Sequence, residues 1–303
     1  MHILLTGGTG LIGRSLCRYW LSQGHSLVVW SRQPEQVSRL CGASVRGIRQ
    51  LADYGEQPLD AVVNLAGAPI ADRPWTRKRK ALLLASRVEL TAQLVSWLGQ
   101  RVDKPQVLLS GSALGWYGDG GEHLLTDDSP AVGDDFAAQL CAAWEFEAQQ
   151  AQTLGIRVVL LRTGLVLARD GGFLARLLTP FKLGLGGRLG NGRQWLPWIH
   201  LADQVALIDF LLHHPDASGA FNACAPVPVR NWEFTQALGR VLHRPSLLPV
   251  PAWVLRALLG ELAGLLLGGQ RALPSRLSAA GFEFRFNDVQ TALNDLLGPE
   301  DAA

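Results

Sequence analysis

The stretch Thr6-Gly7-Gly8-Thr9-Gly10-Leu11-Ile12-Gly13 decides the fold of this chain. It follows the apolar run 3–5, which predicts a strand, and it opens a segment whose apolar residues recur at helical spacing. A strand, a glycine turn and a helix in this order are the context of a dinucleotide-binding fingerprint. The glycines fit both Gly-x-Gly-x-x-Gly, from residue 8, and Gly-x-x-Gly-x-x-Gly, from residue 7. We therefore expect a nucleotide cofactor at this turn.

Each glycine of the turn has its own physical reason. A tight turn after the strand needs a residue that adopts unusual backbone dihedrals, which is Gly7 or Gly8. The pyrophosphate must approach the backbone closely at Gly10, and the helix must pack close to the strand at Gly13. The free N–H groups and the dipole of the helix start then hold the phosphates. A glycine turn without a ligand is the alternative interpretation.

The residues after the second predicted strand, 26–30, indicate which cofactor binds. An NAD site places an acidic residue about 20 positions after the glycines, where it bonds the ribose hydroxyls. Here Ser31 and Arg32 follow the strand, and the first acid is Glu35. A hydroxyl and a guanidinium suit the 2′-phosphate of NADP, because arginine binds phosphate in a bidentate manner. The alternative is a solvated surface arginine.

Strand and helix patterns alternate along the first part of the chain. Apolar runs at 61–65, 107–109 and 156–161 predict strands, while 75–98 and 136–152 predict helices. This alternation favours an α/β fold, a Rossmann-type doubly wound parallel sheet covered on both faces.

We expect two parts in the chain. The Rossmann domain covers 1–170 and also receives segments from about 198–228. A smaller, mostly helical substrate-side and C-terminal region covers 171–197 and 229–303. The run 183–193 holds five glycines, so we expect a loop there, at the substrate side.

Composition and charge indicate in which compartment, and with which kinds of partner, this protein acts. The chain has 303 residues, of which 48% are hydrophobic and 18% charged, with a net charge of +2. The longest apolar stretch, 257–267, is interrupted by Glu261 and is too short to span a bilayer, and the first strand leaves no room for a signal peptide. We expect a cytoplasmic monomer or homodimer without membrane or nucleic-acid partners. The short basic run 77–80 is the one feature that supports an RNA-associated role.

No metal site is expected. The four cysteines are far apart and lack metal or redox spacing. His200 and Asp203 fit a helix start with a packed imidazole, and His213 with His214 fits a solvated helix end.

Together these residues resemble the extended short-chain dehydrogenase/reductase superfamily, and within it the epimerase-like family 39U of NADP-dependent oxidoreductases. The resemblance covers nearly the whole chain and ends in a small C-terminal domain of unknown role. It rests on the glycine turn and on these motifs: Asn64-Leu65-Ala66-Gly67, Ser86-Arg87, Arg162-Thr163-Gly164, Pro180-Phe181-Lys182-Leu183-Gly184-Leu185-Gly186-Gly187, Trp198-Ile199-His200 and Gly269-Gln270-Arg271 to Ala280-Gly281-Phe282.

The resemblance implies a set of residues that bind NADP. They are Gly7, Gly10, Leu11, Ile12 and Gly13 of the turn, followed by Ser31, Arg32, Leu65, Ala66, Gly67, Arg87 and the backbone near Val166. It also implies that Ser112 stands where the superfamily has its catalytic serine.

One departure from the superfamily limits the chemistry. Its reductases use Tyr-x-x-x-Lys, in which the lysine lowers the tyrosine pKa so that the tyrosine transfers a proton at neutral pH. The chain has three tyrosines, and none is followed by lysine four places on. Counting back from Glu145, the pair falls at Ala137 and Cys141, or after a shift of one residue at Phe136 and Leu140.

Two functions remain open. One is an NADP-dependent oxidoreductase or epimerase with altered acid–base residues and an unknown small-molecule substrate, with Ser112 and Tyr117 as catalytic candidates. In the competing interpretation Ser112 caps a strand end and Tyr117 packs in a loop. The second function is a non-catalytic NADP-binding sensor or scaffold.

Overall fold

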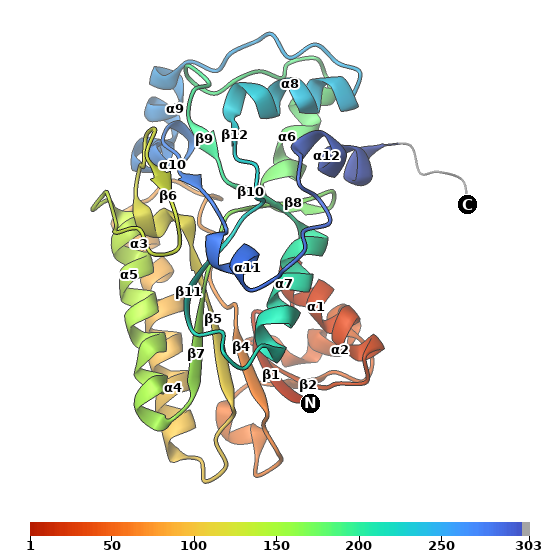
Figure 1. The fold of residues 1–303 in the computed structure, drawn as a ribbon, viewed down its shortest axis with the longest axis vertical. Helices are drawn as coiled ribbons and strands as arrows, with labels where there is room; N and C mark the ends of the chain where they lie inside the picture. Colours follow the sequence, from red (N-terminus) through yellow and green to blue (C-terminus); the bar gives the residue numbers. More distant parts are fainter. Residues whose placement is uncertain (299–303) are drawn as a thin grey trace.

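A computed structural model describes residues 1–298. Its centre is a seven-stranded sheet in the order β11-β7-β5-β4-β1-β2-β3, with all neighbours parallel (Figure 1). The strands are β1 (His2–Thr6), β2 (Ser26–Trp30), β3 (Arg46–Ile48), β4 (Ala61–Asn64), β5 (Val107–Ala113), β7 (Arg157–Thr163) and β11 (Gly219–Ala223). The order reverses between β1 and β4, which is where a doubly wound sheet binds its ligand. The predicted Rossmann-type fold is confirmed.

Strict alternation along the strands places one apolar set on each face of the sheet. Ile3 and Leu5 pack with α1 (Leu11–Ser22), α2 (Val37–Cys41) and α7 (Leu201–His213). Leu4 packs on the opposite face with α4 (Leu90–Gln100) and the end of α5 (Phe136–Gln149). Figure 1 shows these helix layers on either side of the sheet. Because both faces are covered, the strands read as continuous apolar runs.

The helix predicted at 75–98 is one continuous rod with a wide turn inside it. α3 (Arg77–Leu84) passes through a π-helical turn, Ala85–Glu89, into α4. By length and composition alone, 77–100 could cross a membrane. Its residues Leu94 and Leu98 are fully buried in the core beneath the sheet, so we assign it to the helical layer of the α/β fold.

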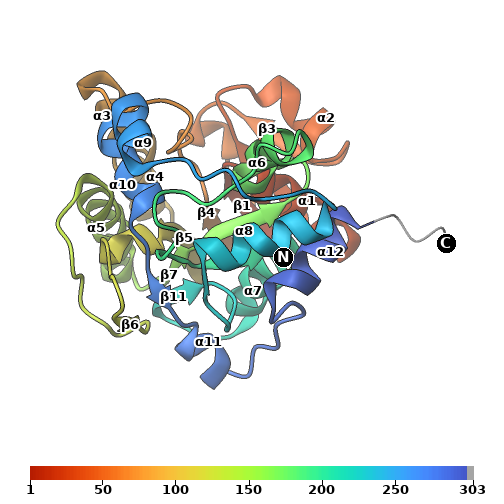
Figure 2. The ribbon, with the colours of Figure 1, turned by 90° about the horizontal axis from the view of Figure 1, so that it is seen from above.

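The smaller region lies beyond the carboxyl ends of the strands. Its helices are α6 (Gly172–Lys182), α8 (Asn231–Val241), α9 (Ala252–Leu259), α10 (Gly264–Leu267), α11 (Ser275–Ala279) and α12 (Val289–Leu297). Three strand pairs connect it to the sheet: β8 (Leu165–Ala168) with β10 (Trp198–His200), β9 (Trp195–Leu196) with β12 (Val229–Arg230), and β6 (Leu124–Leu125) with β13 (Arg271–Ala272). Seen from above, α8 lies across the sheet with α12 beside it (Figure 2). Residues 299–303 of the predicted C-terminal region lie outside the described residues.

Short 3₁₀ turns complete the described chain. They are η1 (Pro34–Gln36), η2 (Leu51–Tyr54), η4 (Leu114–Tyr117), η5 (Gln150–Leu154) and η6 (Gly260–Ala263).

Local details differ from the sequence analysis. The apolar stretch 257–267 is not one continuous element, because Gly260, with a φ of 57°, ends α9 within it. The loop 183–193 is paired rather than open, because Leu248 N donates to Gly186 O, Gly190 N donates to Val250 O and Val250 N donates to Arg188 O. This pairing holds the loop against the segment 248–250.

Candidate functional site

The glycine turn connects β1 to α1 at the carboxyl edge of the sheet. Gly7 has a φ of 71°, which identifies it as the residue that makes the turn. A Cβ on Gly13 would lie 2.4 Å from Gly7 O and 2.6 Å from Gly8 Cα, so only glycine lets the helix approach the turn. A Cβ on Gly10 would meet only Gly7 O, at 3.2 Å, and the space around it is otherwise open.

The first turn of α1 has no capping side chain. Gly10 occupies the N-cap position in an extended conformation, and it has no side chain to accept from the next N–H groups. A helix start leaves its first N–H groups without intrahelical partners. At α1 these groups and the helix dipole face the open space beside Gly10, which is the arrangement that binds phosphate.

Ser31 and Arg32 follow β2 at the same edge of the sheet. Ser31 N donates to Ile48 O, and Ser31 Oγ accepts from Gln33 N at 3.1 Å, which fixes the turn. Arg32 is exposed. Within residues 1–298 no ion pair or hydrogen bond of its guanidinium occurs, whereas Glu35 pairs with Arg49 at 3.5 Å. Arg32 is therefore available for an anion at this edge.

The π-helical turn brings Arg87 over the loop that follows β4. Arg87 Nη2 donates to Ala68 O at 3.0 Å, and a Cβ on Gly67 would lie 2.8 Å from Arg87 Cζ. Ala68 N donates to Ser86 Oγ, while Ala66 N donates to Thr6 Oγ1 at 3.0 Å. Burial lowers the pKa of Arg87 from its ordinary value. The loop 65–67 is thus held between β1 and a half-buried guanidinium.

Two further predicted cofactor residues lie beside the turn. Leu11 packs beneath Gly171, where an added Cβ would lie 3.1 Å from Leu11 Cδ1. Val166 pairs in β8 with Ile199 of β10 and packs against the core on the α1 face.

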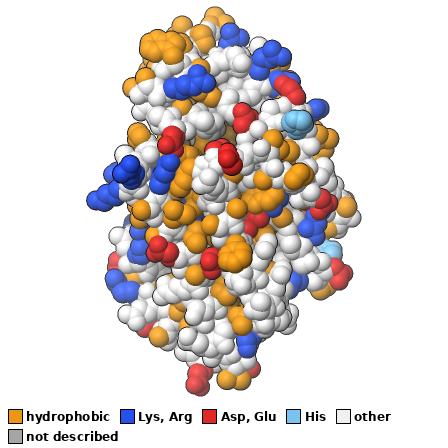
Figure 3. Space-filling model, turned by 90° about the vertical axis from the view of Figure 1, so that its left-hand side faces the viewer, with side chains coloured by type: hydrophobic (Ala, Val, Ile, Leu, Met, Phe, Trp, Pro, Cys, Tyr) orange, Lys and Arg blue, Asp and Glu red, His pale blue; other side chains and the backbone are white. Residues whose placement is uncertain are grey.

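A cavity of about 330 Å³ opens between the carboxyl edge of the sheet and the smaller region. From the predicted cofactor set it is lined by Ile12, Leu65 and Arg87. The other walls come from β5, from one face of α5, from 163–165 and 195–197, and from α10 and the segment 268–270. Figure 3, which views the molecule from the left-hand side of Figure 1, shows hydrophobic side chains around a hollow in the upper half of that side. The loop 183–193 contributes no lining residue to this cavity and is held against 248–250 by its pairing. Its expected place at the substrate side stays a prediction.

Ser112 lies in the cavity wall and bonds to a buried ion pair. The register of β5 and β7 sets Ser112 opposite Arg162, and α5 brings Glu145 over both. Ser112 Oγ donates to Glu145 Oε1 at 2.7 Å. Arg162 donates from Nε to Oε1 at 2.9 Å and from Nη2 to Oε2 at 3.0 Å. Both charged side chains are about 5% exposed, so each depends on the other for compensation.

Tyr117 is not in the cavity wall, so its proposed catalytic role needs correction. Its side chain is fully buried, and its hydroxyl lies 2.8 Å from both Thr126 O and Asn222 Oδ1. Arg162 Nη1 donates to the same hydroxyl at 3.1 Å. Burial raises the pKa of Tyr117, which keeps the phenol protonated. The packed-loop interpretation fits these contacts, because no substrate reaches a hydroxyl enclosed in this way.

The positions expected for Tyr-x-x-x-Lys face the cavity. Ala137 and Cys141 both line it, together with Leu140 and Trp144 one helical turn apart. Burial and the neighbouring charge of Glu145 raise the pKa of Cys141 to about 12, so the thiol is neutral. Of the two registers expected from the resemblance, Ala137 and Cys141 both line the cavity, whereas of Phe136 and Leu140 only Leu140 does. In either register neither residue is a tyrosine or a lysine.

His200 and Asp203 have structural partners, as the sequence suggested. His200 Nδ1 accepts from Ala202 N at 3.0 Å, and its ring packs on Phe286 with centroids 3.9 Å apart. Asp203 accepts from the backbone N–H groups of Arg285 and Phe286. Arg230 is the N-cap of α8, and Asn231 Oδ1 accepts from Leu189 N at 2.8 Å.

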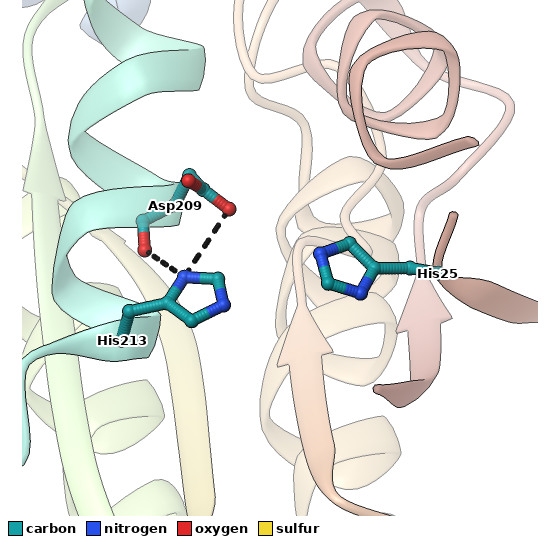
Figure 4. A group of neighbouring side chains, drawn as sticks. All are labelled: His25, Asp209 and His213. Atoms are coloured by element: carbon teal, nitrogen blue, oxygen red, sulfur yellow. Dashed lines mark hydrogen bonds and ion pairs between the residues drawn. The ribbon is translucent and has the colours of Figure 1, made fainter. Parts of the chain in front are cut away.

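Outside the cavity, His25, Asp209 and His213 bring potential metal ligands within 4.8 Å of one another (Figure 4). Both oxygens of Asp209 and the Nδ1 atom of each histidine already have partners. Asp209 Oδ1 accepts from Trp20 Nε1 at 2.8 Å, His213 Nδ1 lies 2.9 Å from Asp209 O, and His25 Nδ1 lies 3.0 Å from the amine of Met1. We interpret the group as a contact between the α1–β2 turn and α7. The absence of a metal site stays a prediction.

Sequence reasoning did not identify Glu145 and Arg162 as parts of the site. Arg162 appeared only within a motif, and Glu145 served only to count the helix register. A signal was present, because both interrupt apolar segments, Val158-Val159-Leu160-Leu161 and Ala142-Ala143-Trp144. A charge within a run that must be buried requires an opposite charge nearby.

The fold and the glycine turn define a nucleotide-binding protein of the short-chain dehydrogenase/reductase type. Residues 3–224 match the NAD dependent epimerase/dehydratase family, and 250–296 match a domain of unknown function, DUF1731. The chain therefore belongs to the NAD dependent epimerase/dehydratase family. The resemblance to the extended, epimerase-like members is confirmed.

Relatives match along nearly the whole chain. Epimerase family protein YfhF of Bacillus subtilis is 37% identical and covers 98% of each chain. The chloroplastic epimerase family protein SDR39U1 homolog of Arabidopsis thaliana is 39% identical, over 98% of this chain and 87% of its own. Human epimerase family protein SDR39U1, solved with NADPH, has a TM-score of 0.90 at 32% identity, over 99% of this chain and 100% of its own.

Proposed function

We propose that this chain is an NADP(H)-binding oxidoreductase or epimerase-like enzyme whose cavity lacks the usual proton donor. The observation that carries the cofactor assignment is the uncapped start of α1 beside an exposed Arg32, with no acid at the end of β2. It is supported by the NADPH in the human relative at 32% identity.

The residues present fit this cofactor. The backbone at Gly10, Leu11 and Ile12 would hold the pyrophosphate, because a Cβ at residue 10 would occupy open space there. Ser31 and Arg32 would hold the 2′-phosphate, and the loop 65–67 under Arg87 would bound the site. When bound, NADP(H) supplies or accepts a hydride. The chain itself supplies binding, orientation and an apolar wall that excludes water.

Cofactor preference should follow Arg32. We expect NADP to bind about tenfold or more tightly than NAD, because a charge-assisted bond to phosphate contributes about 1.5–3 kcal/mol. Arg32→Ala should remove this preference without weakening NAD, while Arg18→Ala, an exposed arginine on α1, should change neither affinity. Titration of both cofactors by calorimetry measures this. Equal affinities of the wild type for NAD and NADP would contradict the assignment.

Reduction of simple ketones should be slow. General acid help is typically worth about 10²–10⁴-fold, and Ala137 and Cys141 cannot provide it. Acceptors that need little protonation should react faster. Oxidation of NADPH followed at saturating acetophenone and at saturating quinone tests this, with Ser110→Ala as the control for Ser112→Ala. Fast ketone reduction that survives Ser112→Ala would show that the acid lies elsewhere.

The same neutral residues favour a second candidate, a non-catalytic NADP-binding sensor or scaffold. Sub-micromolar NADP affinity without turnover of any acceptor would support it. We also propose that the protein acts in the cytoplasm as a monomer or homodimer, without membrane or nucleic-acid partners. Light scattering on the purified full chain determines the oligomeric state.

A further inference from the structure

Few of the polar side chains that line the cavity have a hydrogen-bond donor left free for a ligand. Trp144 Nε1 donates to Thr91 Oγ1 at 3.0 Å, and Trp195 Nε1 donates to Glu122 Oε2 at 3.2 Å. Gln270 Nε2 donates to Gly118 O at 2.5 Å. The single donors of the two tryptophans and one of the two N–H groups of the Gln270 amide are therefore engaged by the protein itself.

The two hydroxyl groups that line the cavity also donate their hydrogen bonds to other groups of the protein. Ser112 Oγ donates to Glu145, and Thr163 Oγ1 donates to Leu161 O at 3.3 Å. The remaining polar lining side chains are Asp119 and Asp135, which accept hydrogen bonds, the weak donor Cys141, and Arg87, whose guanidinium donates to Ala68 O, Ser86 Oγ and Leu83 O. Apart from Arg87, the side chains that line the cavity therefore offer few strong donors to a ligand.

The proton of Ser112 is held firmly on the side of Glu145. Both Glu145 oxygens accept from Arg162, so Glu145 acts only as an acceptor toward the serine hydroxyl. A serine hydroxyl has one proton and two acceptor lone pairs. Once the proton is directed at Glu145, only lone pairs remain for a ligand.

We propose that Ser112 accepts a hydrogen bond from the substrate, so that the cavity selects a reacting group with an O–H or N–H over a carbonyl oxygen. Glu145 is the positioning residue that imposes this polarity. The inference rests on the proposed NADP(H)-dependent function and specifies its substrate class: alcohols, amines and protonated imines. A protonated imine is a substrate that needs no acid from the site. It takes a hydride at carbon from NADPH while its C=N π pair becomes the nitrogen lone pair, and no proton is consumed.

Three probes of similar shape test the polarity without reacting. They are 2-phenylpropan-2-ol, which donates, acetophenone, which only accepts, and α-methylstyrene, which does neither. With saturating NADP⁺ the tertiary alcohol has no hydride to give, and the ketone cannot be oxidised. Dissociation constants are measured by ligand-observed NMR on the full-length protein, and NADP binding is verified in the same samples.

We expect the wild type to bind the alcohol about fivefold more tightly than the ketone, the effect of one neutral hydrogen bond. Ser112→Ala should weaken the alcohol about fivefold and leave the ketone and the alkene unchanged. Ser110→Ala, a buried serine two residues away whose hydroxyl contacts Asn64, should keep the wild-type preference. The double variant Glu145→Leu with Arg162→Met should reverse it, because it removes the acceptor of the serine proton together with its guanidinium partner and frees that proton for a carbonyl.

A reversed preference for the ketone over the alcohol would show that Glu145 positions the serine proton. If Glu145 only kept the site packed, its loss would weaken the binding of all three probes alike. If that double variant does not fold, the comparison of Ser112→Ala with the wild type decides. Equal or tighter binding of acetophenone by the wild type overturns the inference. So does a preference that survives Ser112→Ala, or no binding of the alcohol to the NADP-loaded protein. Failure to bind NADP itself would instead refute the proposed function.

Discussion

Arg162→Met should lower the free energy of unfolding by about 3–5 kcal/mol, because it leaves the Glu145 carboxylate buried without its partner. Glu145 is 4% exposed and accepts two hydrogen bonds from Arg162. The substitution also removes the guanidinium that lies 3.5 Å from the centroid of the Trp116 ring and donates to the Tyr117 hydroxyl. Urea unfolding monitored by tryptophan fluorescence measures the loss.

Two controls separate the buried charge from loss of packing. The double variant Glu145→Leu with Arg162→Met removes both charges and should recover most of the loss, since apolar replacement of a buried pair is often neutral. Arg49→Ala breaks the pair with Glu35, whose side chains are 63% and 61% exposed, and should cost less than about 1 kcal/mol. A double variant as unstable as Arg162→Met would show that the pair is not what stabilises this region.

Gly13→Ala should weaken NADPH binding by about tenfold to a hundredfold. The added methyl group would meet Gly7 O and Gly8 Cα at 2.4 and 2.6 Å, and backbone atoms cannot rotate away as a side chain does. Overpacking of this kind costs about 1–3 kcal/mol, and the shift falls on the turn that faces the phosphates. Fluorescence titration of NADPH on the folded variant measures the effect.

The matched control is Gly99→Ala in α4. There the new methyl group would make ordinary contacts, 3.6 and 3.8 Å from Leu154, and alanine favours a helix over glycine. This variant should bind NADPH like the wild type and be slightly more stable. Unchanged NADPH affinity in Gly13→Ala would show that the close approach of α1 to the turn is not needed for binding.

The fold was readable from the sequence because its signals are local. The glycine turn needs only neighbouring residues: the positive φ of Gly7 and the packing space at Gly13 both belong to one strand–turn–helix unit. The apolar runs were long enough to predict five strands of the large sheet, β1, β2, β4, β5 and β7. The missing Tyr-x-x-x-Lys was equally visible, because that pair has a fixed spacing on one helix.

The wide turn at Ala85–Glu89 was not visible, although it aims Arg87 at the loop 65–67. The same residues would form an ordinary helix in isolation, so the turn is set by what the rod packs against. The loop 183–193 was recognised by its glycines, but its partner, 248–250, is distant in sequence. Composition predicts that a segment lacks regular structure; it does not predict which segment it pairs with.

By itself the sequence determined the Rossmann-type sheet, the family and the absent proton donor. Only the tertiary structure decided that Ser112 bonds Glu145, 33 positions away, and that Arg162 holds that carboxylate while enclosing Tyr117. These partners meet because β5 and β7 pair in one register and α5 crosses above them. The free energy of a buried charge depends on which groups surround it in space, and that arrangement exists only once the strands and the helix have packed together.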